Sequence, residues 1–257
     1  MSTPATSSAH ASNVVGIGRV TASDLLRWAG LPSLADPETD GIVFSLRRVL
    51  AGGLLFAEGQ PLQHLYCVAA GSFKCTQTDI EGYEQVLGFG LHGDLLGLDA
   101  LYEHKHVSSA VALEDSSVAV LPLRELLAAS HRVPAIERLL LHAAGAELLH
   151  RGDAQYLMSA PSSEVRVARF LLHFAQRQLA MGHSGRRLLL RMTRRDIASA
   201  LGVAHETVSR ALTALAQGRC IAVSHREVEI LDADALRETQ RVTRGAAHAR
   251  SVEMLAA

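Results

Sequence analysis

Two hydrophobic patterns divide the chain. From about Val43 to Leu123, short apolar runs alternate with turn residues such as Ala70-Gly71 and Glu81-Gly82. Strands of this length at roughly ten-residue spacing are typical of an antiparallel sandwich or roll. After Pro122 the apolar residues recur three and four positions apart, as they do along one face of a helix. The pattern therefore predicts an α+β chain, in which an antiparallel β-roll is followed by helices.

Helices are expected on both sides of the roll. Ala22 to Trp28 reads as a short helix, Leu123 to Ala129 as a second, and Ala135 to about Ser159 as a long third. A helix of about 25 residues is about 37 Å long, more than one face of a small roll covers. Pairing with a second copy along a coiled-coil seam would cover the rest, and packing within one chain is the alternative. The expected seam residues are Ile136, Leu140, Ala143, Leu149 and Tyr156.

A helix-turn-helix is predicted between Thr193 and Gln217. Thr193-Arg-Arg-Asp196 fits the capping box that begins a helix. Gly202 suits a tight turn between two helices. The elements expected around it are helices Ser163 to about Met181, Arg194 to Leu201, His205 to Gln217 and Asp232 to Thr239, a strand from Arg187 to Met192, and a wing formed by Ile221–Val223 and Val228–Ile230.

The polar side chains at the start of the second helix indicate base recognition. Glu206, Ser209 and Arg210 lie at i, i+3 and i+4 and share one face. Arginine can bond to guanine O6 and N7, glutamate can accept from a cytosine amino group, and serine can contact a base or a thymine methyl. An ordinary surface carrying a Glu–Arg pair is the alternative. Phosphate contacts are expected from Thr193, Arg195, His205, Thr207 and, at the tip of the wing, Arg226.

Charge supports a division into an acidic front and a basic back. Residues 1–160 carry 10 Lys/Arg against 17 Asp/Glu, whereas residues 161–245 carry 14 Arg against 8 Asp/Glu. A basic domain of this kind faces a polyanion such as DNA. The expected divisions are a disordered tail at 1–20, the β-roll at 21–130, the dimerisation helix at 131–160, the DNA-binding domain at 161–240 and a second disordered tail at 241–257.

These motifs resemble the CRP/FNR family of bacterial regulators over roughly residues 40–240. Met192 to Arg210 closely resembles the FNR branch, while Phe56–Gln60, Leu65–Lys74 and Gly88–Asp99 resemble the turns of that family's roll. The resemblance implies a cyclic-nucleotide-binding-like β-roll, a dimer helix and a winged helix-turn-helix. It also implies a homodimer that regulates transcription by reading inverted repeats of TTGAT-type half-sites through the three base-reading residues.

The resemblance carries two further roles. The loop that contains Ile80, Glu81, Gly82 and Tyr83 resembles a surface that contacts RNA polymerase in the FNR branch. Asp153 matches an acidic position in the dimer helix, where two carboxylates facing each other would repel. Such repulsion would make dimerisation conditional.

The sensing end departs from the family, and no cofactor is expected. A [4Fe–4S] cluster needs four thiolates, whereas the chain has three cysteines and none before Cys67. Cyclic AMP is held in its branch by Gly-Glu and Arg-Ser pairs. Here Leu98 follows Gly97 and no arginine stands near Ser108, so a cyclic phosphate would be buried without a partner at high cost.

Other chemistry stays open or is not expected. His104 and His106 could ligate haem iron or another metal, or be solvated loop histidines, and Cys67 and Cys75 could form a redox pair or be buried hydrophobes. No metal site, membrane span, secretory signal or catalytic constellation emerges, so a cytoplasmic protein that is not an enzyme is expected. The rival functions are a cyclic-nucleotide-binding-type module that senses a small ligand and a haem-dependent gas sensor, with weak or no sequence-specific DNA binding.

Overall fold

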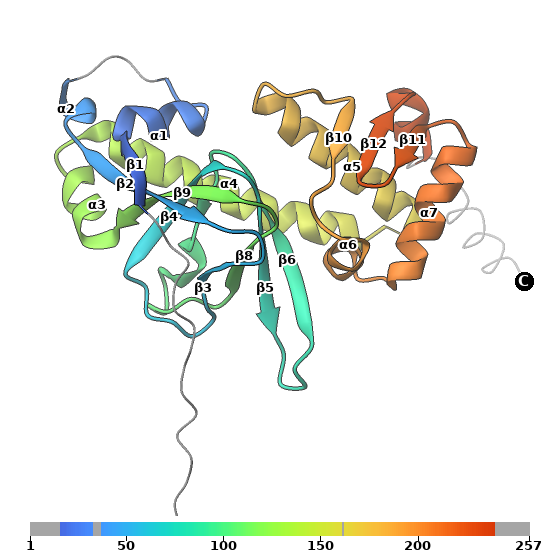
Figure 1. Cartoon of the computed structure of the whole chain (residues 1–257), viewed down its shortest axis with the longest axis horizontal. Coiled ribbons are helices and arrows are strands. Elements are labelled where there is room, and N and C mark those ends of the chain that lie inside the picture. Colours follow the sequence, from blue (N-terminus) through green and yellow to red (C-terminus); the bar gives the residue numbers. More distant parts are fainter. Residues whose placement is uncertain (1–15, 33–36, 161, 240–257) are drawn as a thin grey trace, which may run out of the picture.

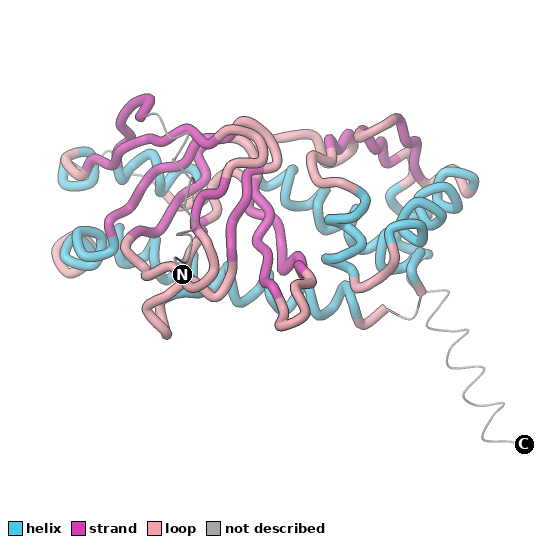
Figure 2. Tube along the Cα trace, turned by 60° about the horizontal axis from the view of Figure 1, so that its bottom comes forward, coloured by secondary structure: helices cyan, strands magenta, loops and turns pink. Residues whose placement is uncertain are grey.

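A computed structural model describes residues 16–32, 37–160 and 162–239. A β-roll, a long helix and a winged helix domain follow one another along the chain and across Figure 1. After a 60° turn, the strands of the roll lie toward one end of the molecule and the helices of the winged domain toward the other (Figure 2). This arrangement confirms the α+β class and the order of elements predicted from the sequence.

The roll consists of two antiparallel sheets. Their orders are β1-β2-β9-β4-β7 and β3-β8-β5-β6. Apolar side chains between the sheets, including Val68, Phe73 and Val118, are fully buried. The strands are β1 (Gly16–Thr21), β2 (Val43–Val49), β3 (Leu54–Phe56), β4 (His64–Ala70), β5 (Phe73–Thr78), β6 (Glu84–Gly90), β7 (Leu95–Leu96), β8 (Ser109–Ala112) and β9 (Ser116–Pro122).

Strand β1 corrects the predicted N-terminal tail. It pairs with β2 from Gly16 opposite Arg47 to Thr21 opposite Val43. The prediction of disorder over residues 1–20 is therefore wrong from Gly16 onward, because backbone pairing to β2 orders a segment that carries few apolar side chains. Residues 1–15 and the predicted tail at 241–257 lie outside the described residues.

A group of helices packs beside the two sheets of the roll. They are α1 (Ala22–Trp28), α2 (Pro37–Asp40), the 3-10 turn η1 (Leu98–Ala100), α3 (Leu123–Ser130) and α4 (Pro134–Met158). Ile136 and Leu139 of α4 are fully buried, in one cluster with Leu25 of α1 and Leu126 of α3. The N-terminal half of α4 is therefore anchored to its own roll.

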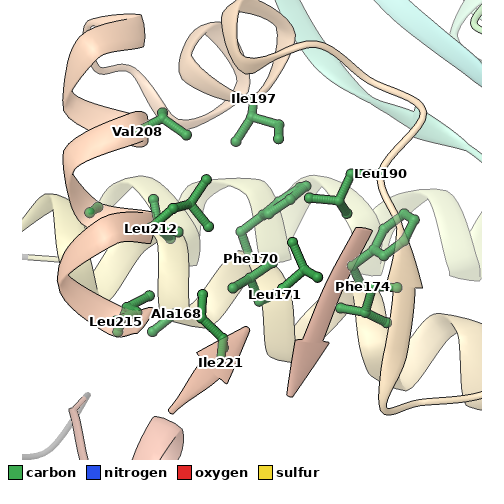
Figure 3. Close-up of a cluster of buried hydrophobic side chains, with 14 of the residues drawn as sticks. Ala168, Phe170, Leu171, Phe174, Leu190, Ile197, Val208, Leu212, Leu215 and Ile221 are labelled. Carbon is green, nitrogen blue, oxygen red and sulfur yellow. The ribbon is translucent and has the colours of Figure 1, made fainter. Parts of the chain in front are cut away.

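The winged domain has the predicted elements. They are α5 (Ser163–Ala180), β10 (Arg187–Leu189), α6 (Arg194–Leu201), α7 (His205–Gln217), β11 (Ile221–Ser224) and β12 (Glu227–Ile230), and a last helix covers residues 233–239. The strands form one sheet in the order β10-β12-β11. Figure 3 shows the core, in which Phe170 and Leu171 of α5 pack with Ile197 of α6 and Leu212 of α7. Strand β10 is shorter than predicted, ending at Leu189.

Candidate DNA interface

The two helices of the reading motif are held at a fixed angle by a cap, a glycine and a shared core. Thr193 Oγ1 accepts from Asp196 N at 3.1 Å, while Asp196 Oδ2 accepts from Thr193 N at 2.8 Å. Gly202 ends α6 with φ +62°, a left-handed conformation that glycine adopts without strain. Ile197 and Val208 then meet in the core beneath the turn (Figure 3). The motif is a rigid platform for whatever α7 presents.

The first turns of α7 present the predicted polar face to solvent. Glu206, Ser209 and Arg210 are all exposed. Arg210 Nη2 donates to Thr207 Oγ1 at 3.3 Å, and no carboxylate of the described residues lies within ion-pair distance of its guanidinium. Glu206 Oε1 instead lies 3.3 Å from His205 Nε2. The Glu–Arg surface pair that was the alternative does not form, so the guanidinium is available to a ligand.

The predicted phosphate-contacting residues differ in how free they are. Arg195 and His205 are exposed, and Thr207 is half-buried. Arg226 lies in the turn between β11 and β12, where its Nη1 donates to Arg191 O at 3.3 Å. The Thr193 hydroxyl donates to Asp196 Oδ2 at 2.6 Å, so it is engaged in the helix cap. A phosphate would therefore have to compete with that cap for Thr193.

Two residues of this face escaped the sequence reasoning. Arg194 Nη2 donates to His225 O at 3.1 Å and thereby fixes the wing to α6. Thr213 is exposed one turn beyond Ser209, and the i, i+4 spacing that identified the other three would have found it.

Helix α4 exposes a different seam from the one predicted. Ile136 and Ala143 are 0% and 8% exposed and pack on their own chain, so the prediction that they face a partner is wrong. Leu140 is half-buried, whereas Leu149 and Tyr156 are exposed as predicted. The prediction selected a neighbouring face of α4. Apolar residues recur at three-and-four spacing on both faces, so the spacing alone does not identify the exposed one. The exposed stripe on α4 consists of Leu141, Gly145, Leu148, Leu149, Gly152 and Tyr156.

Asp153 lies beside this stripe and faces α5. Its Oδ2 is 3.5 Å from His173 Nδ1, and its side chain is 45% exposed. Burial lowers the pKa of His173, although the neighbouring Asp153 carboxylate opposes that shift. Burial also lowers the pKa of His150, one turn before Asp153 on α4. These groups line a cavity of about 900 Å³ between the roll, α4 and α5.

The position in the roll that resembles a nucleotide-binding turn lines the same cavity and carries a carboxylate. Ser108 Oγ donates to Asp99 Oδ2 at 2.7 Å, and His106 Nδ1 is 3.8 Å from Asp99 Oδ1. Burial raises the pKa of Asp99, but His106 and Ser108 outweigh it and the net shift is downward. The His106 ring stacks on Phe56 with centroids 3.9 Å apart. A carboxylate thus stands where an anionic ligand would need cationic partners.

The two histidines of the loop, His104 and His106, differ in their exposure to solvent. His106 is 3% exposed, so it is not a solvated histidine, whereas His104 is exposed. Over the described residues, no group of three or more His, Cys, Asp or Glu side chains is arranged to hold a metal ion.

The cysteines are free thiols. Cys67 lies on β4 and Cys75 on β5, which belong to different sheets. The hypothesis that they face each other across neighbouring strands is therefore wrong. Burial raises the pKa of each thiol to about 12, which keeps both in the unreactive thiol form.

The β5–β6 hairpin extends beyond the rest of the roll (Figure 1). At its tip Ile80 and Tyr83 are 105% and 56% exposed. Asp79 Oδ1 accepts from the backbone of Glu81 and of Tyr83, both at 2.9 Å, and Gly82 takes φ +84°. These bonds give the tip a defined shape.

Among the described helices, none is long and apolar enough to cross a membrane.

Comparison with known proteins agrees with this geometry. Residues 46–132 match the cyclic nucleotide-binding domain and residues 165–239 the Crp-like helix-turn-helix domain. The chain is 36% identical to the transcriptional regulatory protein Btr of Bordetella pertussis over 209 residues, covering 81% of this chain and 86% of the relative. This chain belongs to the CRP/FNR family of transcription regulators.

Other CRP/FNR proteins are similar over most of the chain. The fumarate and nitrate reduction regulatory protein of Escherichia coli is 33% identical over 210 residues, which are 82% of this chain and 84% of that protein. The structure of FixK2 from Bradyrhizobium japonicum has a TM-score of 0.68 and 28% identity, and it covers 76% of this chain and 96% of its own. Membership of the CRP/FNR family confirms that the chain is a DNA-binding transcription regulator and supports its dimerisation.

Proposed function

We propose that two copies of this chain bind an inverted repeat of TTGAT-like half-sites and regulate transcription from it. The observation that carries the proposal is the exposed face of α7. Glu206, Ser209 and Arg210 stand there on one rigid helix, and Arg210 has no carboxylate partner in the described part of the chain. Charged and hydroxyl side chains so placed match base edges in the major groove.

The exposed stripe on α4 supports the symmetric pairing that an inverted repeat requires. Leu148 and Leu149 are 73% and 70% exposed in the middle of the helix, with Gly145 and Gly152 one turn to either side. Two such helices bury these leucines against each other and can approach closely at the glycines. Dimerisation would place two copies of α7 to meet successive major grooves about 34 Å apart.

Three further roles belong to the proposal. The protein works without cyclic AMP, since the buried Asp99 carboxylate would oppose a cyclic phosphate at this position in the roll. The hairpin tip at Ile80 and Tyr83 contacts RNA polymerase. The Asp153 carboxylates lie near the dimer seam, and their repulsion tunes dimerisation. The whole activity takes place in the cytoplasm and involves no catalysis.

A fluorescence-anisotropy titration tests the site. Duplexes carrying the inverted TTGAT repeat, one half-site, or a scrambled sequence are compared at a fixed salt concentration, because phosphate contacts make all affinities salt-dependent. We expect the repeat to bind at least about a thousandfold more tightly than scrambled DNA. Equal affinity for the repeat and the scrambled duplex would refute sequence-specific reading.

Sedimentation of Leu148→Asp tests the dimer. The substitution places a carboxylate in the seam twice, once from each copy, so we expect a dimer dissociation constant at least about a hundredfold higher. Leu127→Asp, on the exposed face of α3, is the matched control and should leave the dimer intact. A Leu148→Asp protein that still sediments as the wild-type dimer would place the interface elsewhere.

A further inference from the structure

Helix α6 covers an open edge of the roll. Strand β6 is an outer strand of the four-stranded sheet, and an outer strand presents unpaired N–H and C=O groups. Ser199 of α6 bonds to two of them, since Val86 N donates to Ser199 Oγ at 2.8 Å and that hydroxyl donates to Glu84 O at 3.3 Å. Gln85 Nε2 donates to Ser199 O. Ser199 of the reading motif thus supplies the hydrogen-bond partners that an adjacent strand would otherwise give to β6.

A charged contact joins α6 to the neighbouring strand β5, one turn earlier along α6. Lys74 Nζ of β5 donates to Asp196 Oδ1 at 3.0 Å and to Glu84 Oε1 at 2.9 Å. The other oxygen of Asp196 caps α6, so the roll holds the reading motif at the residue that begins its first helix. Burial lowers the pKa of Lys74, but the two carboxylates outweigh it and the net shift is upward. The ammonium therefore stays charged.

Beneath these polar contacts the two domains share a hydrophobic core. Leu91 of the roll is 4% exposed within the cluster of the winged domain. Phe89 packs against Phe170 of α5 with ring centroids 6.1 Å apart, and Arg177 of α5 donates to Phe89 O at 2.9 Å. These packed contacts between the domains keep the polar contacts above them in one geometry.

We infer that Lys74, Gln85 and Ser199 are positioning residues for DNA binding, which together we call the clasp. The clasp ties α6 to the roll, and α6 shares its core with α7. The dimer helix α4 is anchored to the same roll. The clasp therefore sets the angle between the recognition helix and the dimer axis. This inference rests on the proposed reading of two half-sites, because only a two-site target senses that angle.

Hydrogen exchange tests the clasp without DNA. The double variant Lys74→Met/Ser199→Ala removes the ammonium and the hydroxyl, and we expect the Val86 amide to exchange at least about tenfold faster. Lys105→Met is the matched control, because Lys105 is the other lysine of the chain and lies on an exposed loop of the roll. Unchanged exchange at Val86 would show that the clasp does not hold in solution.

DNA binding tests the positioning role. The target is the repeat that wild-type protein selects from random duplexes, presented with its natural spacer, with a spacer one base pair longer, and as one half-site. We expect the double variant to bind the natural repeat about tenfold more weakly, to bind the half-site as wild type does, and to discriminate less between the two spacers. Lys74→Met/Ser199→Thr, which keeps a hydroxyl, should recover part of the affinity that Lys74→Met/Ser199→Ala loses.

Other outcomes overturn the inference. Wild-type affinity and spacer preference in the double variant would mean that the clasp does not position α7. Tighter binding would mean that it holds α7 away from DNA. Equal loss on the half-site and the repeat would indicate damage to the reading motif itself. If wild-type protein selects no repeat, the proposed function fails and the positioning role with it, while the exchange experiment still measures the clasp.

Discussion

The winged domain and the β-roll differ in how far the polar side chains of their candidate binding sites are exposed. On α7, Glu206 and Arg210 are exposed, and the guanidinium has no carboxylate partner in the described part of the chain. In the roll, Asp99 is 7% exposed and accepts a hydrogen bond from Ser108. A surface that binds a charged partner leaves its polar groups available. A carboxylate that is buried and already accepts a hydrogen bond has less left to offer a ligand.

This contrast separates reading from sensing within one fold. The two regions match the two domains of the same family, and the charged groups on α7 are exposed whereas the Asp99 side chain of the roll is buried. The contact between Asp99 and Ser108 in the roll is buried, so its loss should lower the stability of the fold. We therefore expect substitutions in the two regions to affect different measurements.

The largest expected effect is on DNA affinity in Arg210→Ala. Loss of a bidentate contact to guanine should cost about 1–3 kcal/mol on the specific repeat and relax selectivity at that base pair. The free energy of unfolding should change by less than about 0.5 kcal/mol, because the side chain is exposed. Anisotropy titrations on matched and single-base-changed duplexes measure the first, and urea denaturation the second.

The control for Arg210→Ala is Arg237→Ala. Both remove one positive charge from the winged domain, but Arg237 pairs with Asp234 at 2.7 Å beyond the wing. It should weaken binding only slightly and equally on all sequences. If the two variants lose the same affinity on every duplex, Arg210 contributes only its positive charge. The proposal that α7 reads bases through Arg210 would then be wrong.

An effect of the opposite kind, on stability instead of DNA affinity, is expected for Asp99→Ala in the roll. The substitution leaves the buried Ser108 hydroxyl without its acceptor, which should cost about 1–3 kcal/mol of unfolding free energy. Base preference should stay that of wild type. Asp234→Ala, whose carboxylate is 93% exposed, is the control and should be nearly neutral. If Asp99→Ala is instead neutral in stability and binds cyclic AMP, the roll is a ligand site blocked by one carboxylate.

The reading motif was predictable from sequence because its signals are local. The Thr193–Asp196 cap, the turn at Gly202 and the face of α7 all arise within one helical turn or two. The α4 seam was not, because three-and-four spacing fits both the stripe through Ile136 and the one through Leu148. Only packing against α1 and α3 decides which stripe is left outside.

Long-range contacts were also beyond local pattern. Strand β1 is ordered by pairing with β2, and His106 is buried by stacking on Phe56. The clasp joins Lys74 to Asp196 across 122 positions of the chain. No spacing rule connects residues so far apart in the sequence. Neither the contact between the two domains nor the burial of His106 could therefore be predicted from the sequence.

The smallest expected effect is a pH dependence at the junction of the two regions. Burial lowers the pKa of His150 and of His173, so the unfolded chain binds protons more readily than the folded one. Stability is then complete above the unfolded value of about 6.5 and falls as the pH drops through the lower, folded pKa.

We expect a loss of less than about 1 kcal/mol per histidine between pH 7.5 and 5.5, since both side chains are partly exposed. Urea midpoints of His150→Gln/His173→Gln should depend less on pH than those of wild type. His142→Gln, an exposed position on the same helix, should retain the wild-type slope. A double variant with the full wild-type slope would locate the acid sensitivity away from this junction, in either the roll or the reading motif.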